Sequence, residues 1–128
     1  MSHIARCKTL LRNVNQDMLK QTINVLAAKH HGSTITAVQD YYGTKTDVDI
    51  GLKTPGFNRG IGIVFNKDGT VEFVCDDFNC EQAVQHLKDE ITQMYTAEAV
   101  AAALNALGYK VEATEINKQI IINGVKEG

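Results

Sequence analysis

Several residue types are scarce in this 128-residue chain, and each scarcity excludes a class of protein. Proline occurs once, at Pro55, and no low-complexity run is present, so we expect no disordered linker inside the chain. No apolar stretch approaches the roughly 20 residues that a membrane helix needs, and we expect no membrane association. Because a chain of this length is typical of one domain, residues 1–128 are predicted to fold as a single unit.

Charge of one sign is not in excess either. The formal net charge is −2 and the isoelectric point is about 6.0, which provides no general attraction to nucleic acid or to an anionic membrane. A local basic cluster is formed by Arg6, Lys8 and Arg12. Elsewhere in the chain two consecutive tyrosines, Tyr41 and Tyr42, could stack on bases. Nothing matches the aromatic motif of an RNA-binding sheet, however, so the sequence disfavours a nucleic-acid partner.

Cysteine is limited to Cys7, Cys75 and Cys80, an odd number. No hydrophobic signal segment follows Met1, since the chain passes directly into sequence typical of a folded domain. We therefore expect a soluble protein in a reducing compartment such as the cytoplasm, with free thiols rather than a disulfide framework.

The strongest local pattern is a hairpin in the middle of the chain. Apolar residues alternate over 61–65 and again over 71–75, and Asn66-Lys67-Asp68-Gly69 between them is a turn sequence. Alternation of period two on both sides of a turn predicts two antiparallel strands with one buried face.

The N-terminal half predicts one helix among strands. Weak alternation indicates a first strand over 4–12, with Cys7 on its buried side, and Asn13 or Asn15 is expected to cap a helix over 16–30. Two further strands are predicted over 34–38 and 47–53. The segment 56–60 is predicted to be a flexible loop.

The C-terminal half predicts helix followed by strand. Asn79 is the expected cap of helical sequence that extends to Leu107, and no Pro or Gly decides between one long helix and two short ones. Strands over 109–113 and 119–122 then form a closing hairpin across Asn117-Lys118. Because an isolated hairpin is barely stable, we expect this hairpin to add to the main sheet.

Together these elements predict an α+β fold. Their order is β-α-β-β-β-β-α-β-β, which favours a two-layer domain with helices packed on one face of a mostly antiparallel sheet. A ferredoxin-like core is the nearest common template. The predicted core consists of Leu19, Ile23, Leu26, Val48, Ile50, Leu52, Ile61, Ile63, Phe65, Val71, Phe73, Leu87, Ile91, Leu104, Leu107 and Val111.

Several short segments occur in a characteristic order along almost the whole chain: Met1–Ile4, Lys8-Thr9, Phe65–Gly69 with Val74 and Asp76, Ile91–Tyr95 and Gly108–Val111. In this order the chain resembles the small uncharacterised family of the hypothetical chloroplast reading frame thirty-five. That family has plastid, cyanobacterial, other prokaryotic and phage members and no known activity. The resemblance implies a location in the cytoplasm, in the plastid stroma, or in the host cytoplasm if the gene belongs to a phage.

The resemblance also implies a partner, because genes of that family often lie near the gene of an AAA-type ATPase. The chain departs from the family pattern at its end, where the usual basic and aromatic tail is replaced by Gly124-Val125-Lys126-Glu127-Gly128. We therefore assign no partner contact to the C-terminal tail of this chain.

Chemical motifs are weak. Cys75, Cys80 and His86 are spaced too loosely for a zinc site, and we expect neither a metal nor a cofactor. Cys80 is expected at the start of a helix, which can lower a thiol pKa, yet it lies in no nucleophile signature. The pair Gly60-x-Gly62 lacks the remainder of a phosphate-binding loop. No catalytic residue is assigned.

The sequence therefore favours a non-enzymatic accessory or adaptor protein that binds a protein partner through a sheet edge or a helix face. The alternative is a small-ligand-binding protein or an enzyme that uses the 54–60 loop with Asp76, Asp77 and Cys80. Pairing of two copies through an edge strand is compatible with the pattern, although no residues demand it. The candidate binding residues are His3, Lys8, Arg59, Asp76, Asp77 and Cys80.

Overall fold

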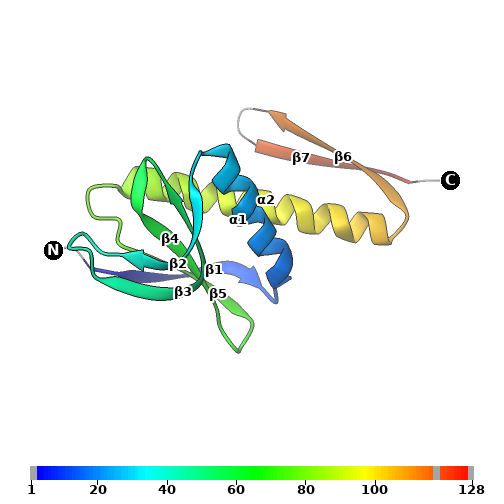
Figure 1. Cartoon of the computed structure of the whole chain (residues 1–128). Coiled ribbons are helices and arrows are strands. Elements are labelled where there is room, and N and C mark those ends of the chain that lie inside the picture. The colour runs from blue at the N-terminus through cyan, green and yellow to red at the C-terminus, as the bar shows by residue number, and fades with distance from the viewer. Residues whose placement is uncertain (1–2, 117–118, 127–128) are drawn as a thin grey trace.

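The computed structural model describes residues 3–116 and 119–126, and it confirms the predicted order of elements. The elements are β1 (Ala5–Arg12), α1 (Gln16–Lys29), β2 (Ser33–Gln39), β3 (Lys45–Thr54), β4 (Phe57–Phe65), β5 (Thr70–Cys75), α2 (Glu81–Ala106), β6 (Tyr109–Ile116) and β7 (Gln119–Lys126). Figure 1 shows a sheet with both helices on one side and a long α2 that extends beyond it. The α+β class and the two-layer arrangement are therefore as predicted.

The main sheet has five strands in the order β1-β5-β4-β3-β2, and every ladder is antiparallel. The central hairpin is confirmed, with Phe65 opposite Val71 and Ile63 opposite Phe73. A ferredoxin-like core contains split βαβ units with parallel strands, so its strand order does not apply here. The predicted flexible loop 56–60 is wrong, because only Pro55 and Gly56 lie between β3 and β4.

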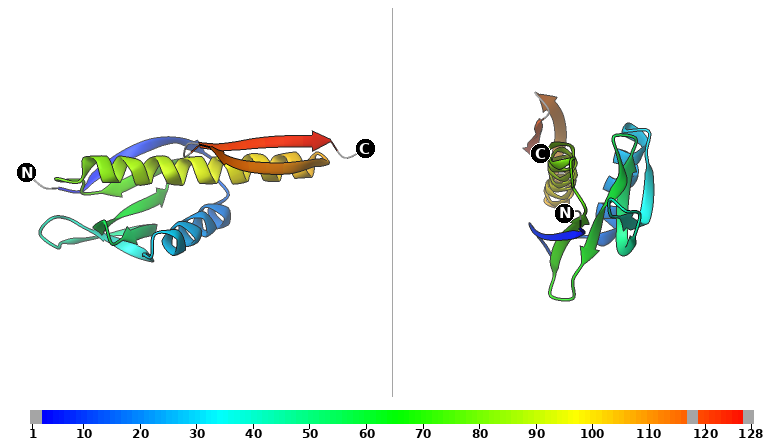
Figure 2. Two further views of the ribbon diagram at one scale, coloured as in Figure 1. Left: turned by 90° about the horizontal axis from the view of Figure 1, so that it is seen from above. Right: turned by 90° about the vertical axis from the view of Figure 1, so that its left-hand side faces the viewer.

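The main core lies between the helices and one face of this sheet. Most of the predicted core residues are buried there, and Tyr95 and Phe57 join them. Leu107 was expected in the core but is 72% exposed. It follows the last residue of α2, at the end of the helix that extends past the sheet (Figure 2).

Both helices begin and end near the predicted residues. Asn15 is the N-cap of α1, and its side chain accepts the N–H of Met18 at 3.0 Å. Helix α2 is one continuous helix rather than two. Its N-cap is Cys80 and not Asn79, since Asn79 has a positive φ of 61° and lies outside the helix.

The closing hairpin does not join the main sheet, so this expectation is wrong. Strands β6 and β7 form a separate two-stranded sheet that packs along α2 (Figures 1 and 2). Gly124 of β7 lies close to Leu104 of α2. The hairpin thus obtains its apolar support from the helix, which replaces the neighbouring strands that a hairpin otherwise needs. Its turn, Asn117-Lys118, lies outside the described residues.

The second face of the main sheet carries a smaller cluster of Val38, Val48 and Val74. Val48 was predicted on the same face as Ile50, but the ladder from β3 to β4 begins at Ile50 and Val48 lies over Gly62 instead. A methyl group built on Gly62 would overlap the Val48 side chain. Glycine at this position therefore allows β3 to lie closely against β4.

Substitution Gly62→Ala is expected to lower the free energy of unfolding by about 1–3 kcal/mol, because the new methyl group overpacks the second cluster. Urea denaturation measures this change. Gly56→Ala is the matched control, since a methyl group there meets only the Thr54 hydroxyl at 4.0 Å. Equal stability of the two variants would contradict the packing of Val48 on Gly62.

Four polar contacts among the described residues connect α1 and its two caps to α2. The Asn15 N–H donates to the Tyr95 hydroxyl at 2.9 Å, and the Thr22 hydroxyl donates to Glu98 at 3.0 Å. At the other end of α1, Glu90 of α2 binds both Lys29, at 2.7 Å, and His30, at 2.5 Å. The sequence indicated that His30 ends α1 but contained no sign of this distant partner.

The two contacts of Glu90 predict that the stability of the fold depends on pH. Burial raises the pKa of Glu90, but hydrogen bonds from Lys29 and His30 outweigh it and hold the pKa below the ordinary 4.5. The carboxylate therefore stabilises the fold above its unfolded pKa, and this contribution is lost as the pH falls through the folded value. Glu90→Gln is expected to cost less than about 1 kcal/mol at neutral pH.

Thermal unfolding of both proteins as a function of pH measures this effect. The difference between wild type and Glu90→Gln is expected to shrink as the pH falls below 4.5. Asp89→Asn is the control, because Asp89 is exposed and accepts a hydrogen bond from Gln85 of the same helix rather than from α1. A difference that stays constant down to acid pH would contradict the proposed role of the carboxylate.

Candidate functional site

The turn between β2 and β3 is fixed by Asp40. Its carboxylate oxygen Oδ1 accepts the N–H groups of Tyr42 and Thr44, both at 2.9 Å. The Asp40 N–H donates to the Thr44 carbonyl at 2.9 Å, and Gly43 adopts a φ of 88° that closes the turn. An aspartate that binds the backbone two residues on is a common way to fix a turn. The two tyrosines at the tip are thereby held in one backbone conformation.

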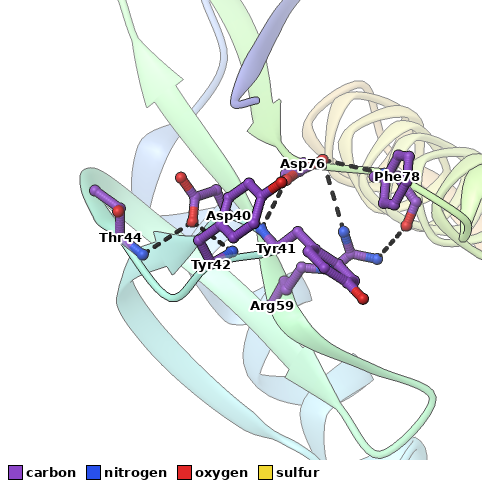
Figure 3. Close-up of polar contacts among 7 residues, drawn as sticks. All are labelled: Asp40, Tyr41, Tyr42, Thr44, Arg59, Asp76 and Phe78. Atoms are coloured by element: carbon purple, nitrogen blue, oxygen red, sulfur yellow. Dashed lines mark hydrogen bonds and ion pairs between the residues drawn. The ribbon is translucent and has the colours of Figure 1, made fainter. Parts of the chain in front are cut away.

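A second carboxylate, that of Asp76, binds the backbone of the same turn. It follows β5 directly, is only 1% exposed, and accepts the Tyr41 N–H at 2.8 Å and the Phe78 N–H at 3.1 Å (Figure 3). Its Oδ1 also lies 3.6 Å from Nη1 of Arg59. A buried carboxylate needs such partners because its desolvation is costly. Asp76 therefore joins β4, the β2–β3 turn and the segment before α2.

Arg59 of β4 completes the arrangement. Its Nη2 donates to the Phe78 carbonyl at 2.5 Å, and its guanidinium lies 5.1 Å from the ring centre of Phe57 and 5.9 Å from that of Tyr41. A cation within about 6 Å of an aromatic face is attracted by the ring. The guanidinium is thus held by a carbonyl, a carboxylate and two rings, and most of it is removed from water.

The outward side of this arrangement is aromatic. Tyr41 is 57% exposed and Tyr42 is 73% exposed, and their rings meet edge to face at 5.5 Å. The ring of Phe78 meets Tyr41 at 5.2 Å from the other side. We call Tyr41, Tyr42, Phe78 and Arg59 the aromatic surface.

The structure brings together only part of the set of candidate residues. Arg59 and Asp76 are in direct contact, and Asp77 and Cys80 lie in the segment between β5 and α2. His3 is exposed just before β1, whose Ala5 lies opposite Cys75 at the same end of the sheet. Lys8 is not part of the arrangement, since it pairs with Glu72 further along β5.

Sequence reasoning missed the contribution of the β2–β3 turn. Tyr41 and Tyr42 were considered only as stacking residues for nucleic acid, and Asp40 was not considered. A signal was present, because Asp40 with Gly43 three residues later is typical of a turn, and Tyr41 and Tyr42 lie between them. Contact between this turn and Asp76 spans 35 residues of sequence and carries no local signal.

The thiols and potential metal ligands do not converge. Cys75 is buried, and burial raises its pKa to about 11, which keeps it protonated at neutral pH. Cys7 is exposed and Cys80 is half-buried. Within residues 3–116 and 119–126, no group of three or more His, Cys, Asp or Glu side chains is placed to hold a metal ion.

The described surface also contains two hollows, one of which borders the aromatic surface at Arg59. One of about 600 Å³ lies over β2, β3 and β4 and includes Asn58 and Arg59. The other, of about 750 Å³, lies between α1, the β3–β4 turn, α2 and β7 and includes Phe57, His86 and Ile120. The predicted ligand site combined the 54–60 segment with Asp76, Asp77 and Cys80. Residues of that segment line both hollows, but Asp76, Asp77 and Cys80 line neither.

In the part of the chain that the structure describes, no helix is both long enough and apolar enough to cross a membrane.

Comparison with known families finds a match to a family model described as "Protein of unknown function (DUF1257)", over residues 21–122. No curated protein and no solved structure matches the chain. The matched range contains the whole aromatic surface and most of the fold.

Proposed function

The chain belongs to the family of proteins of unknown function DUF1257, and from this premise we propose that it is a non-enzymatic adaptor that binds a protein partner through the aromatic surface. The observation that carries this proposal is the exposure of two adjacent tyrosines on a turn whose backbone two carboxylates hold in place. Tyrosine and arginine are the residues most often responsible for binding energy at protein interfaces.

Rigidity adds to this argument. A mobile loop loses conformational entropy when it binds, and this loss reduces affinity. The turn at Asp40 already has its backbone hydrogen bonds, and Tyr41 is further held by Asp76 and Phe78. The backbone that carries the two rings is therefore held in place before a partner arrives.

The same contacts favour binding over catalysis. Asp76 accepts two backbone hydrogen bonds and faces Arg59, so its carboxylate has a structural task. The surface around it contains rings and a guanidinium rather than a nucleophile next to a base.

The nature of the partner rests on the resemblance described above. We propose that the chain belongs to the subgroup of the hypothetical chloroplast reading frame thirty-five, and that its partner is an AAA-type ATPase. The accessory role would then be exercised in the cytoplasm, in the plastid stroma, or in the host cytoplasm for a phage member.

Capture from a lysate of the host tests the proposal. Wild-type protein is expected to retain one dominant protein, an ATPase of this class, and Tyr42→Ala is expected to reduce its recovery by about tenfold or more, as loss of a binding hot spot does. The bound proteins are identified and quantified by mass spectrometry. Because Tyr42 is largely exposed, the melting temperature of the variant should not change.

Leu107→Ala is the matched control, since Leu107 is equally exposed but lies at the far end of α2. It is expected to retain the partner as wild type does. Equal recovery by wild type and Tyr42→Ala would overturn the role of the aromatic surface. A small molecule that remains bound to the intact protein in native mass spectrometry, with no protein partner, would overturn the adaptor role.

A further inference from the structure

Strand β1 forms one edge of the main sheet. It pairs with β5 on one side only, and no described strand pairs with its outer side (Figure 2). Although it was predicted to have a buried face, most of its residues are exposed, Ala5 and Cys7 included. The backbone N–H and C=O groups along such an edge can accept a further strand.

The charge of this edge is uniform. Arg6, Lys8 and Arg12 are the charged residues of β1, and the strand has no carboxylate, although the chain as a whole has a net charge of −2. Lys88 of α2 adds a fourth cation, with its Nζ 3.8 Å from the Cys7 sulfur.

Two carboxylates lie beside this edge and do not balance it. Glu72 lies 3.5 Å from Arg6. Asp68 is in the β4–β5 turn, and its pKa is lowered first by hydrogen bonds from Thr70 and then, in smaller part, by the nearby cations of β1. The three cations of β1 therefore outnumber these two carboxylates, and positive charge is in excess along the strand. Lys88 lies on the face that the helices cover, over the Phe73 ring.

One residue of the edge is apolar and entirely exposed. The ladder between β1 and β5 shifts register between Lys8 and Arg12, so that Leu10 is 100% exposed. Charged residues on an edge strand are a common protection against pairing with other chains. Leu10, between Lys8 and Arg12, does not contribute to this protection, because an exposed apolar side chain favours contact with another chain.

A second copy of this chain does not fit the edge. Two β1 strands in an antiparallel pair would bring Arg6, Lys8 and Arg12 of one copy next to the same cations of the other, and like charges on opposed strands are destabilising. An acidic strand would meet opposite charges at the same positions, and an apolar residue within it would cover Leu10.

We infer that β1 accepts an extended acidic segment of a partner protein, which adds to the main sheet as a sixth strand. The Ala5 end of β1 lies opposite Cys75, directly before Asp76, so the added strand would reach the aromatic surface. This inference rests on the proposed adaptor function and specifies the kind of segment that the partner contributes.

Fluorescence anisotropy with a labelled eight-residue peptide of alternating glutamate and valine tests the inference. The peptide is expected to bind wild type, more weakly as salt increases. Binding should be reduced about tenfold or more by the double change Arg6→Glu with Lys8→Glu, which corresponds to about 1.4 kcal/mol. Lys53→Glu is the control, because it makes the same change from lysine to glutamate at an exposed residue of β3. It should bind the peptide as wild type does.

Backbone pairing is tested separately from charge. A peptide of the same sequence with every second amide N-methylated keeps its charge but loses donors for a ladder, and it is expected not to bind. Hydrogen exchange of the β1 amides should slow when the unmodified peptide is present. Equal binding of the methylated peptide, or unchanged exchange in β1, would overturn strand addition.

Two further outcomes would also overturn the inference. One is absence of peptide binding to wild type, and the other is tight binding of a single-stranded oligonucleotide of equal charge in place of the peptide. The Tyr42→Ala variant separates this inference from the proposed function, because it should still bind the peptide. Peptide binding together with undiminished partner capture by Tyr42→Ala would refute the aromatic surface and leave the strand site standing.

Discussion

Replacing Asp76 with alanine is expected to lower the free energy of unfolding by about 3–5 kcal/mol, the cost of removing one member of a buried ion pair. The substitution leaves the N–H groups of Tyr41 and Phe78 without their acceptor and leaves the Arg59 guanidinium without a counter-ion. Arg59 is mostly buried, so water replaces these partners poorly. This side chain is therefore expected to be the most sensitive polar position outside the apolar core.

Equilibrium unfolding in urea measures this effect, and Asp77→Ala is its matched control. Asp77 is the next residue, and its backbone carbonyl, not its carboxylate, accepts the Cys80 N–H. The double variant Asp76→Ala with Arg59→Ala should be less unstable than the sum of the two single variants, because neither charge is then left alone. Additive effects would show that the two side chains do not act as a pair.

The same variant is also expected to loosen the turn that bears Tyr41 and Tyr42. Once Asp76 is removed, the Tyr41 N–H loses its acceptor, whereas the contacts of Asp40 with Tyr42 and Thr44 remain. Amide exchange of this turn should accelerate more than exchange in the strands. Partner binding would then weaken even at temperatures where the variant is fully folded.

Replacing Ile63 with alanine is expected to cost about 2–5 kcal/mol, as for other large aliphatic side chains removed from a packed core. Ile63 is fully buried, lies opposite Ile50 on one neighbouring strand and opposite Phe73 on the other, and faces the helices. The loss of three carbon atoms leaves a cavity that the two ladders prevent from closing.

Urea denaturation of Ile63→Ala should be compared with that of Leu10→Ala. Leu10 is a similar apolar side chain on the same sheet, but it is fully exposed, and its replacement should change stability by less than about 0.5 kcal/mol. A near-zero cost at Ile63 would mean that the register of the central hairpin is displaced by one residue, which turns the opposite face of the strand to the core.

Local patterns were sufficient for most of the fold. The alternation on both sides of Asn66–Gly69 correctly predicted the central hairpin, and the apolar spacing from Leu19 to Leu26 correctly predicted the buried face of α1. Asn15 was correctly identified as one of two candidate caps. These predictions succeeded because a strand, a helix or a turn depends on residues within a few positions of one another.

Only part of the candidate site could be predicted from such local patterns. Arg59 and Asp76 were both selected from the sequence, but as members of a flexible loop and a ligand site rather than as an ion pair. Arg59 was expected to be mobile, whereas strand β4 begins at Phe57 and holds it in place. The two tyrosines became part of the site only through the hydrogen bond from Tyr41 to Asp76.

By itself the sequence determined the order of elements, the α+β class and the apolar face of β4 and β5, because these follow from the spacing of residues along the chain. The tertiary structure alone decided that α2 is continuous, that the closing hairpin packs on this helix, and that Leu107 remains exposed. It also decided which charges meet, as for His30 with Glu90 and Arg59 with Asp76. Such contacts join residues far apart in the chain, and their formation depends on how whole elements pack together.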